Sequence, residues 1–230
     1  MVWIVLHFVR KDAGFSLRRR TEKLRFSVRL RELCEAIQSS HNLKRSFQKQ
    51  TMEDKMNLSQ VIIKTNRLLL VPISPKLREA IFQNLTKEIT KYMYPQPTGN
   101  IKDTDDFIER SSKKNLDGID LQLIITDLES GEFLGCAGMH HIDQRSPELG
   151  IWLKKDAHGH KYGQEAMRAI KEWADKNIRY LYIKYPVAKA NIPSRKVAES
   201  LGGVLIHEVP LINQLGEEHV GVEYFIYPPK

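Results

Sequence analysis

Residues 156–166 read Asp-Ala-His-Gly-His-Lys-Tyr-Gly-Gln-Glu-Ala and join two segments of different periodicity. The segment before them, Glu148 to Leu153, is short and apolar and predicts a strand. The segment Tyr162 to Lys176 repeats its apolar residues every three or four positions and predicts a helix. Unpaired backbone N–H groups and the helix dipole favour an anion at such a helix N-terminus. Gly159 and Gly163 would let the backbone approach a phosphate closely, although the same glycines could simply turn the chain.

The elements around this unit predict a mixed α/β domain. Further strands are expected at residues 67–73, 121–127, 132–139, 180–187, 204–212 and 219–226, and further helices at 76–85, 104–113 and 192–201. The crossover through the long helix predicts that the strands at 148–153 and 180–187 run parallel. Because ligands in such sheets favour the carboxyl ends of the strands, we expect the functional site at that end of the sheet.

The net charge of +8 lies entirely in the first 51 residues. They hold 12 Lys/Arg and 4 Asp/Glu, whereas the rest of the chain holds 24 of each. A basic protein often binds nucleic acid, but the main body is neutral, so nucleic acid is not expected as its partner. We therefore expect two parts, a basic leader at residues 1–55 and a folded domain at residues 56–230.

The leader has three consecutive arginines at 18–20 and, at 21–37, apolar residues spaced as in a basic amphipathic helix. It could be a disordered extension, a nucleic-acid arm, a membrane-surface helix or an organellar presequence. It could also lie upstream of a true start at Met52 or Met56. A dispensable extension, or sequence upstream of the true start, is the favoured interpretation, because the domain that follows has a full set of predicted elements without the leader.

The composition argues against several other classes of protein. Cys34 and Cys136 match no metal or redox spacing, so we expect no metal site and a reducing, cytoplasmic location. No apolar run approaches the roughly 20 residues that are needed to span a bilayer, so no membrane span is expected. The early run Val2 to Val9 is short and has no basic residue before it, which argues against a secretory signal.

Four segments resemble motifs of the GNAT superfamily of N-acetyltransferases. His158 to Gly163 is similar to the phosphate-binding signature Q/R-x-x-G-x-G/A, and Asn191 to Gly203 is similar to N-x-x-S-x-x-V-x-E-x-L-G-F. Thr65 to Leu70 resembles the opening strand of the branch that acetylates ribosomal-protein N-termini at alanine or serine. Glu148 to Leu153 resembles the splayed central strand of that branch. The four matches follow the family's order over about three quarters of the chain.

The resemblance implies a fold and a co-substrate. The fold is a mostly antiparallel mixed sheet of about six to seven strands with a parallel central pair, flanked by about four helices. The co-substrate is acetyl-CoA, with no metal. The residues that the resemblance assigns to binding acetyl-CoA are Ile151, Leu153, His158, Gly159, His160, Lys161, Tyr162, Gly163, Gln164, Asn191 and Ser194.

Two residues depart from the phosphate-binding signature. His158 stands where glutamine or arginine is usual, and its imidazole can still donate to a phosphate. Lys161 replaces the middle glycine. A lysine at positive φ costs on the order of 1 kcal/mol, whereas with helical dihedrals it would add a cation beside the pyrophosphate. We expect helical dihedrals, because Gly159 is close enough to take up the turn; loss of cofactor binding is the alternative.

Acetyl transfer needs a base for the amine, donors for the oxyanion and a proton for the leaving thiolate. By resemblance, the pantetheine arm lies between the strands at 148–153 and 180–187, and backbone N–H groups near Ile151 face the thioester carbonyl. Glu148 is the expected base, acting directly or through water. Ser194 is expected to bond the cofactor sulfur or to protonate the thiolate.

Each of these assignments has an alternative. Glu148 could be an exposed strand carboxylate, and Ser194 and Asn191 could cap the helix that they begin. His140 and His141 follow the preceding strand, and one of them could face the same cleft as a base, since histidine suits proton transfer near neutral pH.

The resemblance implies an enzyme that acetylates a primary amine by direct attack in a ternary complex, as a monomer or homodimer. The acceptor amine is either a protein N-terminus, as the segment Thr65 to Leu70 suggests, or a small molecule. Tyr224 on the last strand is a second candidate acid, or a packing residue with a bonded hydroxyl. A non-catalytic acyl-CoA-binding regulatory module is the alternative function, and Lys161 would favour it.

Overall fold

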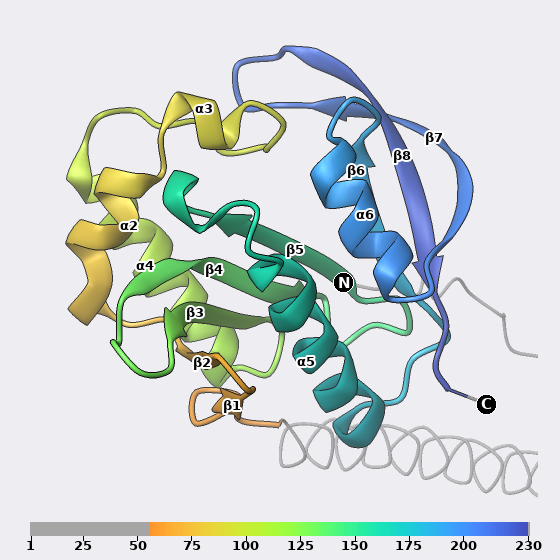
Figure 1. Ribbon diagram of the computed structural model, residues 1–230, viewed down its shortest axis with the longest axis horizontal. Helices are drawn as coiled ribbons and strands as arrows, with labels where there is room; N and C mark the ends of the chain where they lie inside the picture. Colours follow the sequence, from red (N-terminus) through yellow and green to blue (C-terminus); the bar gives the residue numbers. More distant parts are fainter. Residues whose placement is uncertain (1–55, 230) are drawn as a thin grey trace, which may run out of the picture. The chain divides into compact units, whose positions relative to one another are not determined.

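The computed structural model describes residues 56–229, and the predictions for the leader at 1–55 lie outside them (Figure 1). The strands are β1 (Ile63–Lys64), β2 (Leu68–Pro72), β3 (Leu121–Asp127), β4 (Phe133–His140), β5 (Glu148–Leu153), β6 (Ile183–Ala188), β7 (Val204–Ile212) and β8 (Glu218–Ile226). The helices are α2 (Arg78–Asn84), α3 (Lys87–Thr90), α4 (Ile101–Leu116), α5 (Tyr162–Asn177) and α6 (Ile192–Ser200). Short 3-10 turns at Pro75–Leu77 and Lys155–Ala157 precede α2 and α5.

The described strands form one sheet in the order β1-β2-β3-β4-β5-β6-β8-β7. Each neighbouring pair is antiparallel except β5 and β6, which run parallel. The predicted fold class and its parallel central pair are therefore confirmed. The sheet has eight strands where six or seven were expected, because the two-residue β1 adds an edge through its pairing with β2. The four-residue α3 likewise brings the described helices to five.

The starts of α4 and β6 each differ by three residues from those predicted, and in each case a hydrogen bond explains the difference. Helix α4 begins at Ile101 rather than 104, because the Asn100 side chain accepts the Lys102 N–H at 3.1 Å and caps the first turn. Strand β6 begins at Ile183 rather than 180, since the Leu181 N–H donates to the Arg145 carbonyl and not to a strand. Within residues 56–229, no helix is long and apolar enough to cross a membrane.

The sheet divides in two at the junction of β5 and β6. These strands pair at a single position, Glu148 with Lys184, next to a hydrogen bond of 2.8 Å from the Lys184 N–H to the Pro147 carbonyl. Beyond that point β5 stays paired with β4 along its length, and β6 stays paired with β8. The backbone groups of β5 and β6 that face each other are therefore left without a strand partner. Figure 1 shows the two halves diverging.

Two apolar clusters lie on the opposite faces of the sheet. One packs α5 against the sheet and includes Leu123, Ile125 and Met167. The other packs α2 and α4 and includes Ile124 and Phe133. Because consecutive residues of β3 serve opposite faces and both faces are covered, the strand is buried almost throughout rather than at alternate positions. Helices therefore pack on both faces of the sheet and hold β3 and β4 in place. The split lies at the next strand along, between β5 and β6 (Figure 1).

Candidate active site

The loop before α5 turns through two left-handed residues. Gly159 has a φ of 84°, and Lys161 has φ 63° and ψ 15° at the N-cap of α5. The expectation of helical dihedrals at Lys161 was therefore wrong. The chain arrives extended at His158 (φ −73°, ψ 154°) and must reverse into the helix at Tyr162. Gly159 alone does not complete that reversal, so Lys161 bears strain of about 1 kcal/mol.

The first turn of α5 has no side-chain cap among the described residues, and Lys161 makes no capping hydrogen bond. The first N–H groups of a helix need partners from outside it, and the helix dipole gives them a partial positive charge. The start of α5 is therefore suited to an anion, as the sequence indicated.

The side chains of the loop are mostly held by the protein itself. The His158 Nε2 atom lies 3.0 Å from the Leu153 carbonyl oxygen, which fastens the loop to the end of β5. The His160 ring stacks on Tyr162, with 5.5 Å between the ring centroids, and the Arg67 guanidinium lies 4.7 Å from the Tyr162 centroid. An anion here would be bound chiefly by the backbone, since these rings already have neighbours.

Gly163 brings α5 close to β5 and to α6. A Cβ atom at this position would lie 3.7 Å from a terminal methyl group of each of Ile151, Leu153 and Val197. Gln164 adds a weaker link, since its Nε2 atom lies 3.4 Å from the Lys196 carbonyl oxygen of α6. The loop, β5 and α6 thus meet at one place.

The start of α6 carries the second predicted motif. The Asn191 side chain accepts the Ser194 N–H at 3.3 Å, so Asn191 caps the helix as the alternative assignment proposed. The Ser194 hydroxyl lies 3.0 Å from the hydroxyl of Tyr185 on β6. Burial raises the pKa of Tyr185 to about 12, with the Ser194 hydrogen bond acting in the opposite direction. Tyr185 therefore keeps its proton at neutral pH.

Tyr185 is a residue that the sequence analysis missed. Its signal is weak, because the alternation of Ile183, Tyr185 and Val187 in β6 is the pattern of ordinary core residues. Tyr224, the second candidate acid, is a packing residue instead. It is buried, and its hydroxyl accepts from Arg195 and donates to Glu199, each at 3.0 Å.

Glu148 stands where the sheet divides. It pairs with His140 of β4 on one side and with Lys184 of β6 on the other. Burial raises the pKa of the Glu148 carboxyl; electrostatic interactions with His140, His141 and Lys184 act against that rise, and Glu223 adds to it. A carboxylate with a raised pKa is a stronger base than an exposed one.

A cavity of about 1350 Å³ brings part of the predicted site together. Glu148, Ile151, Asn191 and Ser194 line it, together with His140 and Tyr185. The other predicted residues, Leu153 and the loop 158–164, do not line this cavity. Leu153 is the last residue of β5, and the loop 158–164 leads into α5, on the face of the sheet that α5 covers.

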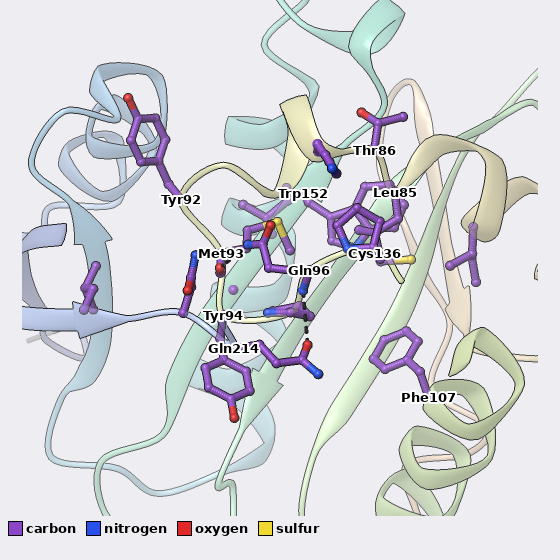
Figure 2. Close-up of a pocket in the computed structure, with 18 of the residues that line it drawn as sticks. Leu85, Thr86, Tyr92, Met93, Tyr94, Gln96, Phe107, Cys136, Trp152 and Gln214 are labelled. Carbon is purple, nitrogen blue, oxygen red and sulfur yellow. Dashed lines mark hydrogen bonds between the residues drawn. The ribbon is translucent and has the colours of Figure 1, made fainter. Parts of the chain in front are cut away.

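The far end of the cavity is closed by two segments that the sequence did not bring together. The loop at 92–98 meets the turn between β7 and β8, where Gln214 accepts the Gln96 N–H at 3.3 Å and donates its own N–H to the Tyr94 carbonyl at 2.9 Å. Figure 2 shows Gln96 and Gln214 facing each other beside Tyr94. Aromatic and apolar side chains, including Trp152 and Phe107, line this end.

Known proteins resemble this chain in sequence and in fold. Residues 67–204 match the family described as the acetyltransferase (GNAT) domain. An uncharacterised N-acetyltransferase, p20, of Bacillus licheniformis is 28% identical over 116 residues, which are 50% of this chain and 65% of that protein. The chain thus spans slightly less than two thirds of this curated relative.

Two solved structures show the same fold. A protein from Vibrio cholerae described as a putative ribosomal-protein-serine acetyltransferase superposes with a TM-score of 0.63 at 16% identity, covering 74% of this chain and 99% of its own. The ribosomal L7/L12 α-N-protein acetyltransferase in complex with coenzyme A superposes with a TM-score of 0.64 at 15% identity, covering 73% of this chain and 98% of its own. Their names match the branch that Thr65 to Leu70 resembles. With its split sheet, its uncapped α5 and a family match over more than half its length, the chain belongs to the GNAT acetyltransferase family.

Proposed function

We propose that the chain transfers an acetyl group from acetyl-CoA to a primary amine by direct attack in a ternary complex. The observation that carries the proposal is the split between β5 and β6, with Glu148 at its apex and Ser194 lining the same cavity. The split leaves backbone donors and acceptors free along β5, and an extended pantetheine arm can pair with them as an added strand would.

The two ends of acetyl-CoA would meet different parts of this arrangement. The pyrophosphate would lie at the first turn of α5, bound by N–H groups of the loop 158–164. The thioester would lie in the cavity, where backbone N–H groups near Ile151 could stabilise the oxyanion. Asn191 already uses its side-chain oxygen as a cap, which leaves its amide N–H groups to bond the arm.

The residues that line the cavity fit the proton transfers of the reaction. Glu148 would accept a proton from the amine, directly or through water, since a primary amine is mostly protonated at neutral pH. The leaving thiolate would take a proton from Ser194, and Tyr185, hydrogen-bonded to Ser194 and protonated at neutral pH, would restore it.

Cys136 also supports direct attack rather than an acyl-enzyme intermediate. It lines the cavity (Figure 2), but it is fully buried, and burial raises the pKa of its thiol far above the ordinary value. A cysteine nucleophile needs an accessible thiolate. Among the described residues Cys136 is the only cysteine, so the acetyl group would pass straight from sulfur to nitrogen.

The acceptor is proposed to be a protein N-terminus or a small amine. The names of the two structural neighbours favour a protein N-terminus. The cavity supports an acceptor of some length, because about 1350 Å³ exceeds the roughly 300–1,000 Å³ of an ordinary small-molecule site. The pantetheine arm would fill part of this space.

The test is thiol release from acetyl-CoA by the full-length chain, measured against a panel of N-terminal peptides and small amines. Release with an amine, together with acetylated product of the expected mass, supports the proposal and identifies the acceptor class. The alternative is a regulatory module that binds acyl-CoA without turnover, which the departure at Lys161 favours. Tight binding of acetyl-CoA with no release across the panel would support that alternative.

A further inference from the structure

A buried carboxylate stands behind one wall of the cavity. The Asp120 side chain is only 5% exposed and has three donors around it. They are the Lys114 ammonium at 2.9 Å, the His140 Nδ1 atom at 3.2 Å and the His141 backbone N–H at 2.9 Å. Burial by itself raises the pKa of Asp120, but these donors outweigh it and hold the pKa well below the ordinary value. Asp120 is therefore an anion at every pH at which the protein would work.

The anion fixes the state of the His140 ring. With Asp120 ionised, the Nδ1 atom of His140 carries the hydrogen and donates it to the carboxylate. The lone pair of the neutral ring is then on Nε2. A carboxylate that orients an imidazole in this way also stabilises the imidazolium that forms when Nε2 takes a proton.

The Nε2 atom of His140 faces the open cavity. His140 lies opposite Glu148 in the β4–β5 register, and both residues line the cavity. Gly150 on β5 is a neighbour of this atom, since a Cβ atom added at Gly150 would lie 3.7 Å from Nε2. Because Gly150 has no side chain, space is left in front of Nε2 for a substrate or a water molecule.

We propose that His140 is a catalytic residue that accepts the first proton of the acceptor ammonium, and that Asp120 is its positioning residue. The inference rests on the proposed function and adds to it a second proton acceptor beside Glu148. Burial disfavours the ionised form of Glu148, and the neighbouring Asp120–His140 pair offers the proton an alternative site.

The ammonium gives one proton to Nε2 of His140, and the nitrogen lone pair forms the bond to the thioester carbon. The carbon–sulfur bond then breaks with its electron pair on sulfur, which takes the proton that Ser194 supplies. Glu148 takes the second nitrogen proton as the amide forms. That proton then replaces the one that Ser194 gave up, through the hydrogen-bonded hydroxyls of Ser194 and Tyr185. The proton on His140 is released to solvent.

Several charged groups surround the Asp120–His140 pair and affect the pH dependence of the reaction. His140 faces Asp120 and Glu148; Lys114 is bonded to Asp120, and His141, Lys184 and Glu223 act on Glu148. If both Glu148 and His140 must be unprotonated, the fall of kcat/KM at low pH depends on both. Removal of either then lowers the limiting slope of log kcat/KM against pH by one proton relative to the wild type.

The experiment compares the wild type with His140→Gln, Asp120→Asn and the control His141→Asn, all in the full-length chain. Asparagine suits the control because His141 is exposed with φ 58°. For His140→Gln we expect kcat to fall on the order of 100-fold, with the KM for acetyl-CoA unchanged and the low-pH slope reduced by one. For Asp120→Asn we expect the low-pH limb to move to lower pH, because the imidazolium loses its counter-ion. For His141→Asn, whose side chain does not line the cavity, we expect the kcat of the wild type at the pH optimum and the same limiting slope.

Full activity and an unchanged slope in His140→Gln would overturn the inference. Circular dichroism and thermal melting show whether His140→Gln folds. If it does not, Asp120→Asn is the test: a low-pH limb of kcat/KM at the same pH as in the wild type would also contradict the inference. The proposed function fails separately, if the wild type releases no thiol with any amine. An active wild type with an inactive Glu148→Gln and a normal His140→Gln would leave the function standing and remove only His140.

Discussion

The hydroxyl groups of Tyr185 on β6 and Ser194 on α6 lie 3.0 Å apart at the wall of the cavity. The two residues are nine positions apart, and the turn that caps α6 with Asn191 brings them together. The Tyr185 hydroxyl is buried and keeps its proton at neutral pH. The Ser194 hydroxyl in front of it lines the cavity and can donate its proton to a substrate.

This pairing predicts a non-additive loss of activity. Ser194→Ala should lower kcat by 10-fold or more, and Tyr185→Phe by about 10-fold, because each breaks the same proton supply. The double variant should be no slower than Ser194→Ala, since residues that act in series do not contribute twice. Steady-state kinetics with a saturating amine measures this, and additive losses would show that the two hydroxyls act separately.

Glu148→Gln should lower turnover on the order of 100-fold and make the domain more stable at neutral pH. Burial raises the pKa of Glu148, so the folded state disfavours the ionised form. The free energy of unfolding therefore falls as pH rises from the ordinary glutamate pKa to the raised pKa of folded Glu148. It stays at the lower value at higher pH. The gain in Tm of the variant should be present at pH 7 and disappear below the ordinary glutamate pKa. Melting curves from pH 4 to 8 measure it; equal Tm values at pH 7 would contradict it.

Lys161→Gly should raise Tm by a few degrees. It removes left-handed strain of about 1 kcal/mol, which corresponds to roughly 2–4 °C in a domain of this size, less the entropy cost of glycine. Lys161→Ala is the matched control, because it also loses the cation but keeps the strained dihedrals. A rise in the KM for acetyl-CoA in both variants would show that the ammonium assists binding, whereas a rise in neither would assign binding to the backbone.

Gly163→Leu should raise the KM for acetyl-CoA, whereas Gly163→Ala should leave it near the wild-type value. A Cβ atom at this position has ordinary contacts at 3.7 Å with Ile151, Leu153 and Val197, but a larger side chain has no room. It would push the start of α5 away from β5 and disturb the N–H groups of the first turn. Initial rates at varied acetyl-CoA and a fixed amine concentration give the KM of each variant. An unchanged KM in Gly163→Leu would place the phosphate site elsewhere.

Cys136→Ala should retain turnover within a few-fold, because a buried, protonated thiol takes no part in direct transfer. The variant should lose a little stability, on the order of 1 kcal/mol, from the space left in the core. Double-reciprocal plots of initial velocity against acetyl-CoA concentration, at several amine concentrations, should give intersecting lines, as a ternary complex requires. Parallel lines, together with an inactive Cys136→Ala, would indicate an acyl-enzyme instead.

The sequence by itself determined the features whose signals are local. The strand at 148–153, the helix that starts at Tyr162 and their parallel crossover all lie where periodicity and glycine placement put them. The resemblance of the loop and of Asn191 to Gly203 named the family, and the match over residues 67–204 confirms it. These signals survive because hydrophobic spacing and turn chemistry act over a few residues.

Tertiary structure decided what depends on distant contacts. The backbone at Lys161 is left-handed because the chain must leave β5 and enter α5 in a direction that packing fixes, and no local signal overrides that requirement. Asp120 orients His140 from 20 residues away, and Gln96 meets Gln214 across 118. Spacing along the chain carries no information about such pairs, because the fold alone determines which side chains share a buried wall.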